Sequence, residues 1–177
     1  VANVILNAEN GVDIDMSGAA GKYGFTINGG EAESLLTGSS FNDVITGKQR
    51  DDILIGNGGN DTFTGGGGDD IFWPYKGNDQ VEDAGNGNDI IIYDRGTSII
   101  IKNTGSDAIT VTASRPNAFV VSTTAGTRTA DASSSTADVT FYGSGAGANK
   151  VTYTGGIGDD TIQGGLAGDL LIGNAGN

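Results

Sequence analysis

Aspartate is the residue whose spacing could do chemistry in this sequence. In the first half of the chain it recurs at steps of nine residues, with one step of ten, and a large apolar residue follows two positions after each one. The phased aspartates are Asp43, Asp52, Asp61, Asp70, Asp79 and Asp89. The apolar residues that follow them are Ile45, Leu54, Phe63, Phe72, Val81 and Ile91. A short side chain holds its carboxylate close to the backbone, so carboxylates repeated in register are suited to binding divalent cations.

These aspartates belong to blocks of nine residues that organise much of the chain. From Gly38 the blocks read GSSFNDVIT, GKQRDDILI, GNGGNDTFT, GGGGDDIFW and PYKGNDQVE, and AGNGNDIII follows after one inserted residue at Asp83. GGIGDDTIQ from Gly155 and GGLAGDLLI from Gly164 resume the pattern near the end. Glycine makes up 32 of the 177 residues, and it permits positive φ in tight turns. Each block therefore predicts a six-residue turn followed by a three-residue strand whose central apolar side chain points inward.

The blocks resemble the G-G-x-G-x-D-x-U-x nonapeptide of RTX proteins, the hemolysin-type calcium-binding repeat, in which U is a large apolar residue. Gly56–Thr64, Gly65–Trp73 and Gly155–Gln163 match closely, and the resemblance covers roughly half of the chain. It implies an all-β fold, a right-handed parallel β-roll or β-helix, in which two blocks complete one coil. Aspartates 18 residues apart in this sequence would then stack at the ~4.8 Å spacing of neighbouring strands.

The resemblance also implies a set of calcium ligands. In RTX proteins one Ca²⁺ sits between each pair of stacked turns, held by an aspartate from each turn and by turn carbonyls. Carried over to this chain, that gives four sites, with one or two more seeded near the end, and so four to six ions: Asp43/Asp61, Asp61/Asp79, Asp52/Asp70 and Asp70/Asp89, then Asp160 and Asp169. The glycines expected to help form these sites are Gly56, Gly58, Gly59, Gly65, Gly67, Gly68, Gly77, Gly87, Gly156 and Gly158.

Stacked carboxylates also call for cations on electrostatic grounds. At ~4.8 Å and an effective dielectric of about 20, adjacent carboxylates repel by roughly 3 kcal/mol. Ca²⁺ accepts about 6–8 oxygens in flexible geometry, backbone carbonyls included, whereas Mg²⁺ demands an octahedron and keeps its waters. Phe41 and Arg50 stand where the family has glycine, so looser and weaker turns are expected there. The insertion at Asp83 leaves the geometry of the Asp70/Asp89 pair open.

We divide the chain into four segments: an N-terminal β cap or metal-free coils at 1–37, an RTX calcium β-roll at 38–92, a β-rich continuation or side sheet at 93–145, and a second RTX calcium segment at 146–177. Gly29–Thr37 is interpreted as a degenerate coil, with Leu36 at the apolar position and Ser34 where aspartate belongs. Ser122–Ala137 is rich in Ser, Thr and Ala and is expected to be a loop. Continuation of the solenoid through 93–145 is favoured because the aspartate phase resumes afterwards.

Composition excludes several classes of function. The net charge of −13 makes nucleic acid a poor partner. With no Cys and no His, disulfides, ordinary zinc sites and Ser-His or Cys-His nucleophiles are excluded. No apolar run approaches the ~18 residues of a spanning helix, so membrane insertion is not expected. Carboxylate pairs such as Asp69/Asp70 are interpreted as one calcium ligand beside one solvent-facing residue, and no enzyme activity is expected.

Two functions remain open on the sequence alone. The resemblance implies type I secretion, with the chain folding on Ca²⁺ outside the cell. The favoured function is a structural module of a secreted bacterial surface protein, such as a surface layer, an adhesin or an extracellular fibre. The alternative is the calcium-dependent folding and secretion module of an enzyme or toxin whose active domain is absent from this sequence. A parallel roll exposes unpaired backbone at its ends. Two alternatives stay open there: this sequence is part of a longer array, or calcium-linked self-assembly end to end covers the open coil.

Overall fold

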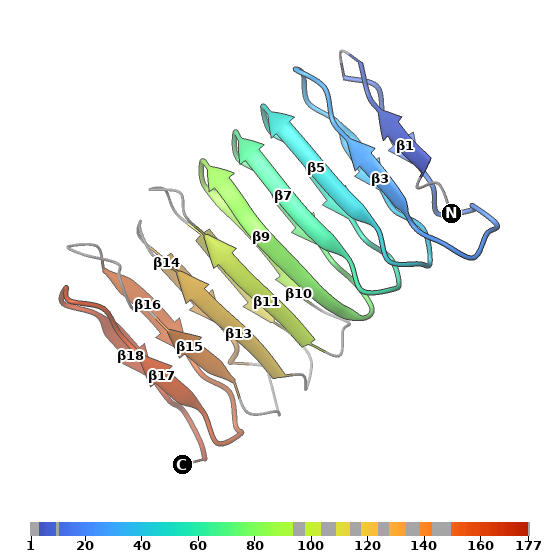
Figure 1. The fold of residues 1–177 in the computed structure, drawn as a ribbon. Coiled ribbons are helices and arrows are strands. Elements are labelled where there is room, and N and C mark those ends of the chain that lie inside the picture. The colour runs from blue at the N-terminus through green and yellow to red at the C-terminus, as the bar shows by residue number, and fades with distance from the viewer. Residues whose placement is uncertain are drawn as a thin grey trace.

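The protein is a two-sheet parallel β-solenoid (Figure 1). The computed structural model describes residues 4–9, 11–93, 98–103, 109–113, 118–123, 128–133, 139–142 and 150–176, and in these residues it contains strands and no helix. Each coil contributes one strand to each of two nine-stranded sheets, so that the chain alternates between them. The predicted all-β solenoid class is therefore confirmed.

The odd-numbered strands form one sheet, here called the odd sheet, and the even-numbered strands form the even sheet. The odd sheet contains β1 (Val4–Asn7), β3 (Phe25–Asn28), β5 (Val44–Gln49), β7 (Thr62–Gly67), β9 (Asn78–Asn86), β11 (Ser98–Asn103), β13 (Ala118–Thr123), β15 (Thr140–Tyr142) and β17 (Thr161–Gln163). The even sheet contains β2 (Ile14–Asp15), β4 (Leu35–Thr37), β6 (Ile53–Ile55), β8 (Ile71–Trp73), β10 (Asp89–Tyr93), β12 (Ile109–Ala113), β14 (Arg128–Asp131), β16 (Val151–Thr154) and β18 (Leu170–Ile172).

The pairing register reproduces the 18-residue step of the sequence. Ile45 of β5 lies beside Phe63 of β7, and Leu54 of β6 lies beside Phe72 of β8. The degenerate coil obeys the same step, because Leu36 of β4 pairs with Leu54. From β3 to β8 a strict period of two nine-residue blocks thus places each strand directly beside the strand one coil earlier.

The inserted residue is absorbed in β9 as a β-bulge. Phe63 pairs with Val81, but Thr64 pairs with Asp83, which leaves Glu82 as the extra residue. The nine-residue phase predicts the insertion at Asp83, and the bulged residue in the structure is one position earlier. The bulge lies in a strand, so the register of the following turn is restored.

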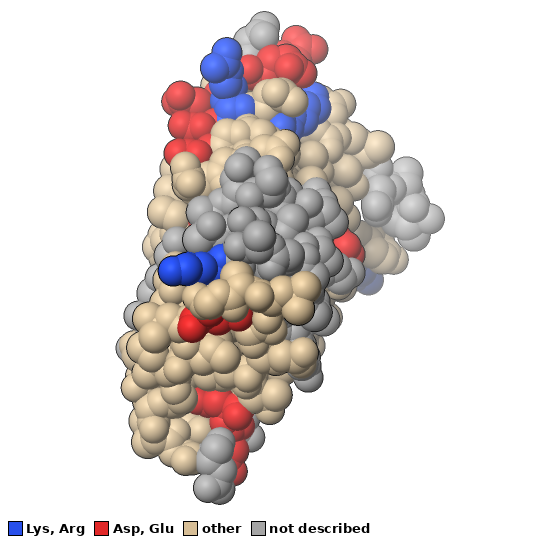
Figure 2. All heavy atoms as spheres, turned by 90° about the vertical axis from the view of Figure 1, so that its left-hand side faces the viewer, with Lys and Arg blue, Asp and Glu red and all other residues tan. Residues whose placement is uncertain are grey.

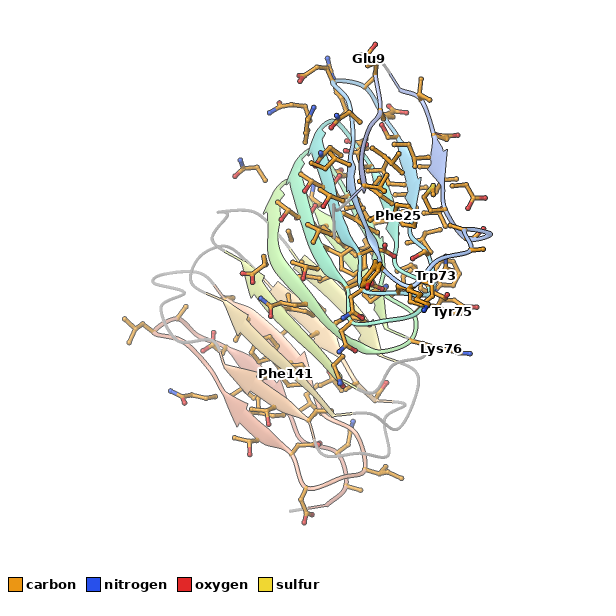
Figure 3. The ribbon with its side chains drawn as sticks, turned by 45° about the vertical axis from the view of Figure 1, so that its right-hand side comes forward. Glu9, Phe25, Trp73, Tyr75, Lys76 and Phe141 are labelled. Atoms are coloured by element: carbon orange, nitrogen blue, oxygen red, sulfur yellow. The ribbon has the colours of Figure 1, made fainter. Side chains whose placement is uncertain are left out.

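The core lies between the two sheets, where short strands such as β6 and β8 each contribute one buried apolar side chain, and it runs along most of the solenoid. The six predicted apolar positions, from Ile45 to Ile91, are fully buried. Phe63 and Phe72 from opposite sheets meet edge to face, with ring centroids 6.3 Å apart. In the C-terminal half Phe141 stacks on Tyr153 at 4.7 Å (Figure 3). Each coil therefore buries its apolar residue only against its neighbours, as in other repeat architectures.

The region 93–145 continues both sheets rather than forming a side sheet, because its strands pair with those before and after it. The expected Ser122–Ala137 loop is wrong in part. β14 (Arg128–Asp131) lies within that range, with Ala130 buried in the core, while residues 124–127 and 134–138 lie outside the described residues. Residues 14–37 supply strands of the same two sheets. The four-segment division itself stays a prediction.

Candidate calcium-binding turns

The phased aspartates lie in two columns, one along each edge of the solenoid. The backbone N–H of Asp43 donates to Oδ1 of Asp61 at 2.8 Å, and that of Asp61 donates to Oδ1 of Asp79 at 3.0 Å. The second edge repeats this arrangement. There Asp52 donates to Asp70 at 2.8 Å, and Asp70 donates to Asp89 at 3.0 Å. The bulge in β9 thus leaves the Asp70/Asp89 pair with the geometry of the others.

These carboxylates are buried, and several of their oxygen atoms have no hydrogen-bond partner. All six phased aspartates from Asp43 to Asp89 are at most 2% exposed. The Oδ2 atoms of Asp52, Asp61, Asp70 and Asp79 are buried and have no hydrogen-bond partner. An ionised oxygen in that situation costs several kcal/mol unless a counter-charge reaches it. Both columns therefore fit a bound cation.

The turn glycines keep oxygen atoms close to those carboxylates. A Cβ on Gly65 would overlap both Oδ2 of Asp70 and the carbonyl oxygen of Ala84 one coil later. A Cβ on Gly56 would overlap Oδ2 of Asp61 in the same way. No group of three acidic side chains occurs in the described part of the chain. A cation here would therefore take two carboxylates and complete its shell with backbone carbonyls, which suits Ca²⁺.

The turns are shaped by positive φ at their second and fourth positions. In the turn of Gly65–Asp70 these are Gly66 at 120° and Gly68 at 113°. At the fourth position of other turns, Gly59, Gly77 and Gly87 adopt φ of 110°, 142° and 136°. Third-position residues pair between coils, Gly58 with Lys76, and Gly67 with Gln49 and Asn86. The glycines between Gly56 and Gly87 that the resemblance implies thus occupy equivalent places in stacked turns, whereas Gly156 and Gly158 do not adopt positive φ.

The two turns that lack the family glycines behave differently. Lys48 (φ 101°) and Arg50 (φ 77°) take the left-handed conformation that glycine holds elsewhere. That turn therefore has the steric cost of roughly 1–2 kcal/mol per residue that a non-glycine residue has there, and weaker calcium binding at this turn stays a prediction. Phe41 does not adopt positive φ. In its turn Ser39 donates its amide to Oδ2 of Asp43 at 2.7 Å, and its hydroxyl lies 3.0 Å from the same atom.

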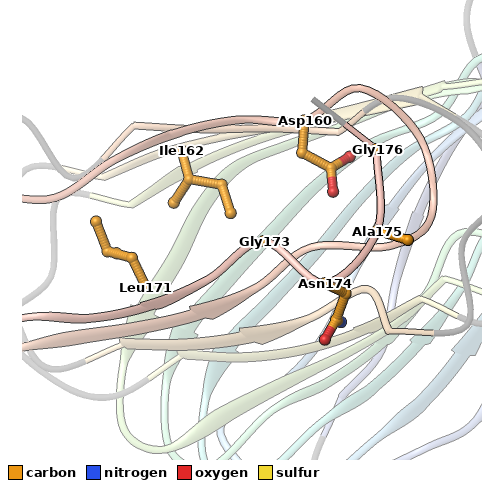
Figure 4. Close-up of a pocket in the computed structure, with 7 residues that line it drawn as sticks. All are labelled: Asp160, Ile162, Leu171, Gly173, Asn174, Ala175 and Gly176. Atoms are coloured by element: carbon orange, nitrogen blue, oxygen red, sulfur yellow. The ribbon is translucent and has the colours of Figure 1, made fainter.

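The C-terminal aspartates resemble Asp43 more than Asp61. Oδ1 of Asp160 accepts the amide of Val139, and Oδ1 of Asp169 accepts that of Val151, both at 3.0 Å. Their Oδ2 atoms accept amides within their own turns, from Gly156 at 2.8 Å and from Gly165 at 2.7 Å. Figure 4 shows Asp160 beside the turn that carries Gly176. A Cβ on Gly176 would overlap the carbonyl oxygen of Gly158, so these two turns also stack closely.

A second ladder, which the sequence analysis missed, runs outside each aspartate column. It uses the residue immediately before each phased aspartate, and its hydrogen bonds run in the opposite direction along the chain. Asn60 N donates to Oδ1 of Asn42, and Asp69 N donates to Oδ1 of Asp51, both at 2.8 Å. Asp51 and Asp69 are exposed, in contrast to Asp52 and Asp70. The signal was present in the sequence, because Asn and Asp repeat there in the same nine-residue phase.

Opposite charges gather near the N-terminal end of one edge. Figure 2 shows basic and acidic side chains together at the top of this face. Glu31 and Lys48 line one groove there, and Glu33 and Arg50 line another. On this edge Ser34 replaces the aspartate, and its amide donates to Oδ1 of Asp52 at 2.8 Å. The first pair of turns on this edge, which carries Ser34 and Asp52, thus includes the basic residues Lys48 and Arg50. The turns of Asp70 and Asp89 contain no basic residue.

Burial raises the pKa of four of the column carboxylates. It raises the pKa of Asp61 to about 8 and that of Asp70 to about 7, from an ordinary 3.8. It also raises the pKa of Asp52 and that of Asp79 to about 6. The amide that each carboxylate accepts from the preceding coil opposes the shift, and stacked neighbours add to it at Asp61 and Asp70. Without a metal ion, protons are therefore the competing ligands of these oxygens.

We expect acid to stabilise the calcium-free protein. Because the folded-state pKa values of Asp61 and Asp70 exceed the ordinary value, the folded chain binds more protons than the unfolded chain between about pH 4 and pH 8. This stabilisation is complete below pH 4 and is lost as pH rises through 6 to 8. Far-UV circular dichroism in chelator should show more β-structure at pH 5 than at pH 8. A β signal that grows with pH in chelator would contradict this expectation.

Comparison with known proteins places the repeats in one family. The sequence matches the pattern described as RTX calcium-binding nonapeptide repeat in four copies, at residues 37–72, 46–81, 83–100 and 152–177. Together these cover half of the chain, including both aspartate columns. No curated protein and no solved structure matches the chain. The described residues contain no helix long and apolar enough to cross a lipid bilayer.

Proposed function

The chain belongs to the RTX calcium-binding nonapeptide repeat family, and from that premise we propose that it is a structural module of a secreted bacterial surface protein. As a calcium-binding β-solenoid it has the architecture of a structural module. Proteins with these repeats are typically secreted by bacteria. The proposal adds that this chain folds outside the cell and serves there as part of a surface layer, an adhesin or a fibre.

The observation that carries this proposal is the pair of buried, uncompensated aspartate columns. The Oδ2 atoms of Asp61 and Asp70 require a cation in the folded state. Ligand that binds only the folded chain stabilises it in proportion to the logarithm of ligand concentration. Millimolar external calcium would therefore favour folding, and scarce cytosolic calcium would leave the chain unfolded and ready for export.

The continuity of the two sheets favours a structural role over that of a secretion module. β11 to β15 join the two aspartate-bearing halves through unbroken pairing, which makes one long solenoid. Catalysis is not part of the proposal. The proposal does include growth end to end. Leu171 lies at a core position yet is 43% exposed, and Figure 4 shows it near Ile162 at the end of the described solenoid. A further coil, from this chain or another, would cover both residues.

Localisation on intact producing cells tests the proposal. An antibody against the calcium-folded chain should label the surface of unpermeabilised cells in millimolar calcium. A wash with a calcium chelator should remove most of that label, because the epitope unfolds, while a wash that depletes only magnesium should not. Labelling only after permeabilisation would refute a surface role. Recovery of the chain in the medium on an enzyme or toxin would support the secretion-module alternative instead.

A further inference from the structure

The outer faces of the two sheets differ although the same repeat builds both. In the three-residue strands β4, β6 and β8 the central side chain is buried and the two flanking side chains point outward. On the odd sheet, the outward residues of β3 to β7 and the first of β9 are polar except for one valine: Thr26, Asn28, Val44, Thr46, Thr62, Thr64 and Gln80. On the even sheet, those of β4 to β10 are apolar except for Thr37: Leu35, Ile53, Ile55, Ile71, Trp73, Ile90 and Ile92.

These seven apolar residues of the even sheet, here called the even-face patch, form straight rows. Leu35 pairs with Ile53, Ile53 with Ile71, and Ile71 with Ile90, each one strand further along. Leu35, Ile53 and Ile90 are 38%, 39% and 40% exposed. In the second row Ile55 pairs with Trp73, whose ring lies 5.9 Å from that of Tyr75 (Figure 3). No charged side chain interrupts the patch across these four strands.

Strand formation does not account for this bias. Threonine is as well suited to an exposed strand as isoleucine, and the odd sheet uses threonine at the equivalent positions. On its N-terminal side the patch has a polar border. There Asp15 of β2 pairs with Thr37 of β4, so two polar residues begin the second row. The patch thus combines exposed apolar side chains with an absence of charged outward-facing residues in these four strands, which is the composition of the core of a protein interface.

We propose that the even-face patch is a contact surface for a second copy of this chain, packed face to face about a two-fold axis. The rows repeat at the ~4.8 Å strand spacing, and a rigid surface matches such rows over several rungs only if it has the same spacing. A second copy has that spacing by construction. Two sheets can pack face to face at ~10 Å with aligned strands, and two-fold dimers are the commonest assembly.

Charge and area set the strength expected for this contact. The net charge of −13 would oppose association, but the patch itself is uncharged, so its core can be desolvated without burying a carboxylate. Four strands span ~19 Å and three residues span ~10 Å, giving a footprint of ~200 Å². That is well below the ~800 Å² per partner of a standard complex. The dimer is therefore weak, reversible and dependent on protein concentration.

Sedimentation equilibrium in millimolar calcium, over a wide range of protein concentration, tests the proposal. The unmodified chain should associate reversibly as its concentration rises, with a dimer as the first species formed. The double variant Ile53→Thr/Ile71→Thr should raise the dimer dissociation constant by more than about tenfold. Val44→Thr is the matched control, because Val44 is 43% exposed at the equivalent position of the odd sheet, and it should change nothing. Calcium-dependent circular dichroism would establish that each variant folds.

A second measurement does not depend on how well the threonine variants fold. The chain has no cysteine, so Ile71→Cys and Val44→Cys each introduce a single thiol, one on each face. Under mild oxidation in calcium, Ile71→Cys should form disulfide-linked dimers much faster than Val44→Cys. A chain that stays monomeric at all concentrations, or equal cross-linking from the two faces, overturns the proposal. Association whose dissociation constant is the same in Ile53→Thr/Ile71→Thr as in the unmodified chain overturns it as well, because the contact then lies elsewhere, as in end-to-end stacking.

Discussion

At pH 8 a calcium chelator is expected to convert the chain from a β spectrum to a coil-like one, and added millimolar calcium is expected to reverse the change. The reason lies in the two aspartate columns, where six carboxylates are at most 2% exposed. Without a cation, each column places like charges one strand spacing apart in a poorly solvated edge. Burial of such charges costs several kcal/mol per ion even after relaxation. The core receives one buried apolar side chain from each short strand such as β6 or β8, so burial of these side chains contributes too little free energy to offset that cost.

The size of the calcium effect can be bounded. A ligand at a hundred times its dissociation constant stabilises the folded state by ~2.7 kcal/mol per site, so four sites would supply ~11 kcal/mol. That is comparable to the whole stability of an ordinary domain, ~5–15 kcal/mol. Calcium is thus expected to decide between the folded and unfolded chain rather than adjust an existing balance.

The measurement is far-UV circular dichroism at pH 8 across a series of free calcium concentrations. Magnesium at the same concentration is the control, and it should restore little structure, because it requires octahedral geometry and gives up its waters reluctantly. A full β spectrum in chelator at pH 8 would show that the columns are stable without metal, and the calcium-folding proposal would fail.

Replacing a central aspartate is expected to cost more than replacing a terminal one. Asp61 is bonded to both neighbours in its column, since its Oδ1 accepts the amide of Asp43 and its amide donates to Asp79. Asp61→Ala should therefore disable two stacked sites and lose ~5 kcal/mol of calcium-dependent stability, against ~3 kcal/mol for the single site of Asp43→Ala. Asp70→Ala should behave like Asp61→Ala, because Asp70 is central in the other column.

The chain offers a matched control for each of these variants. Asp69 precedes Asp70 and is exposed in the outer ladder, so Asp69→Ala removes the same charge without removing a buried carboxylate. Its calcium titration should stay close to that of the unmodified chain. Calorimetric titration would report both the number of ions bound and their affinity. Equal losses in Asp43→Ala and Asp61→Ala would contradict a column in which each ion is shared between two turns.

The nine-residue period of the sequence was sufficient to predict the coil, the six core positions from Ile45 to Ile91 and the two aspartate columns. Each of these follows from phase alone, as with Ser34 and Leu36, which keep the phase although their coil has lost its aspartate. The features that were missed depend on something other than phase. β14 escaped notice because Ala130, a small residue, fills its core position. The outer ladder depends on the direction of its hydrogen bonds, and the even-face patch on which sheet each block joins.

The bulge at Glu82 has a consequence for how such an array can vary over time. An array of stacked sites depends on spacing, and one added residue in a turn would displace a carboxylate and every turn after it. Here the added residue lies in β9, where it costs one unmatched position opposite β7, and Asp89 still meets Asp70. The strand thus confines the effect of the inserted residue to one position. Insertions at such strand positions can therefore arise in evolution without separating the stacked aspartates of neighbouring coils.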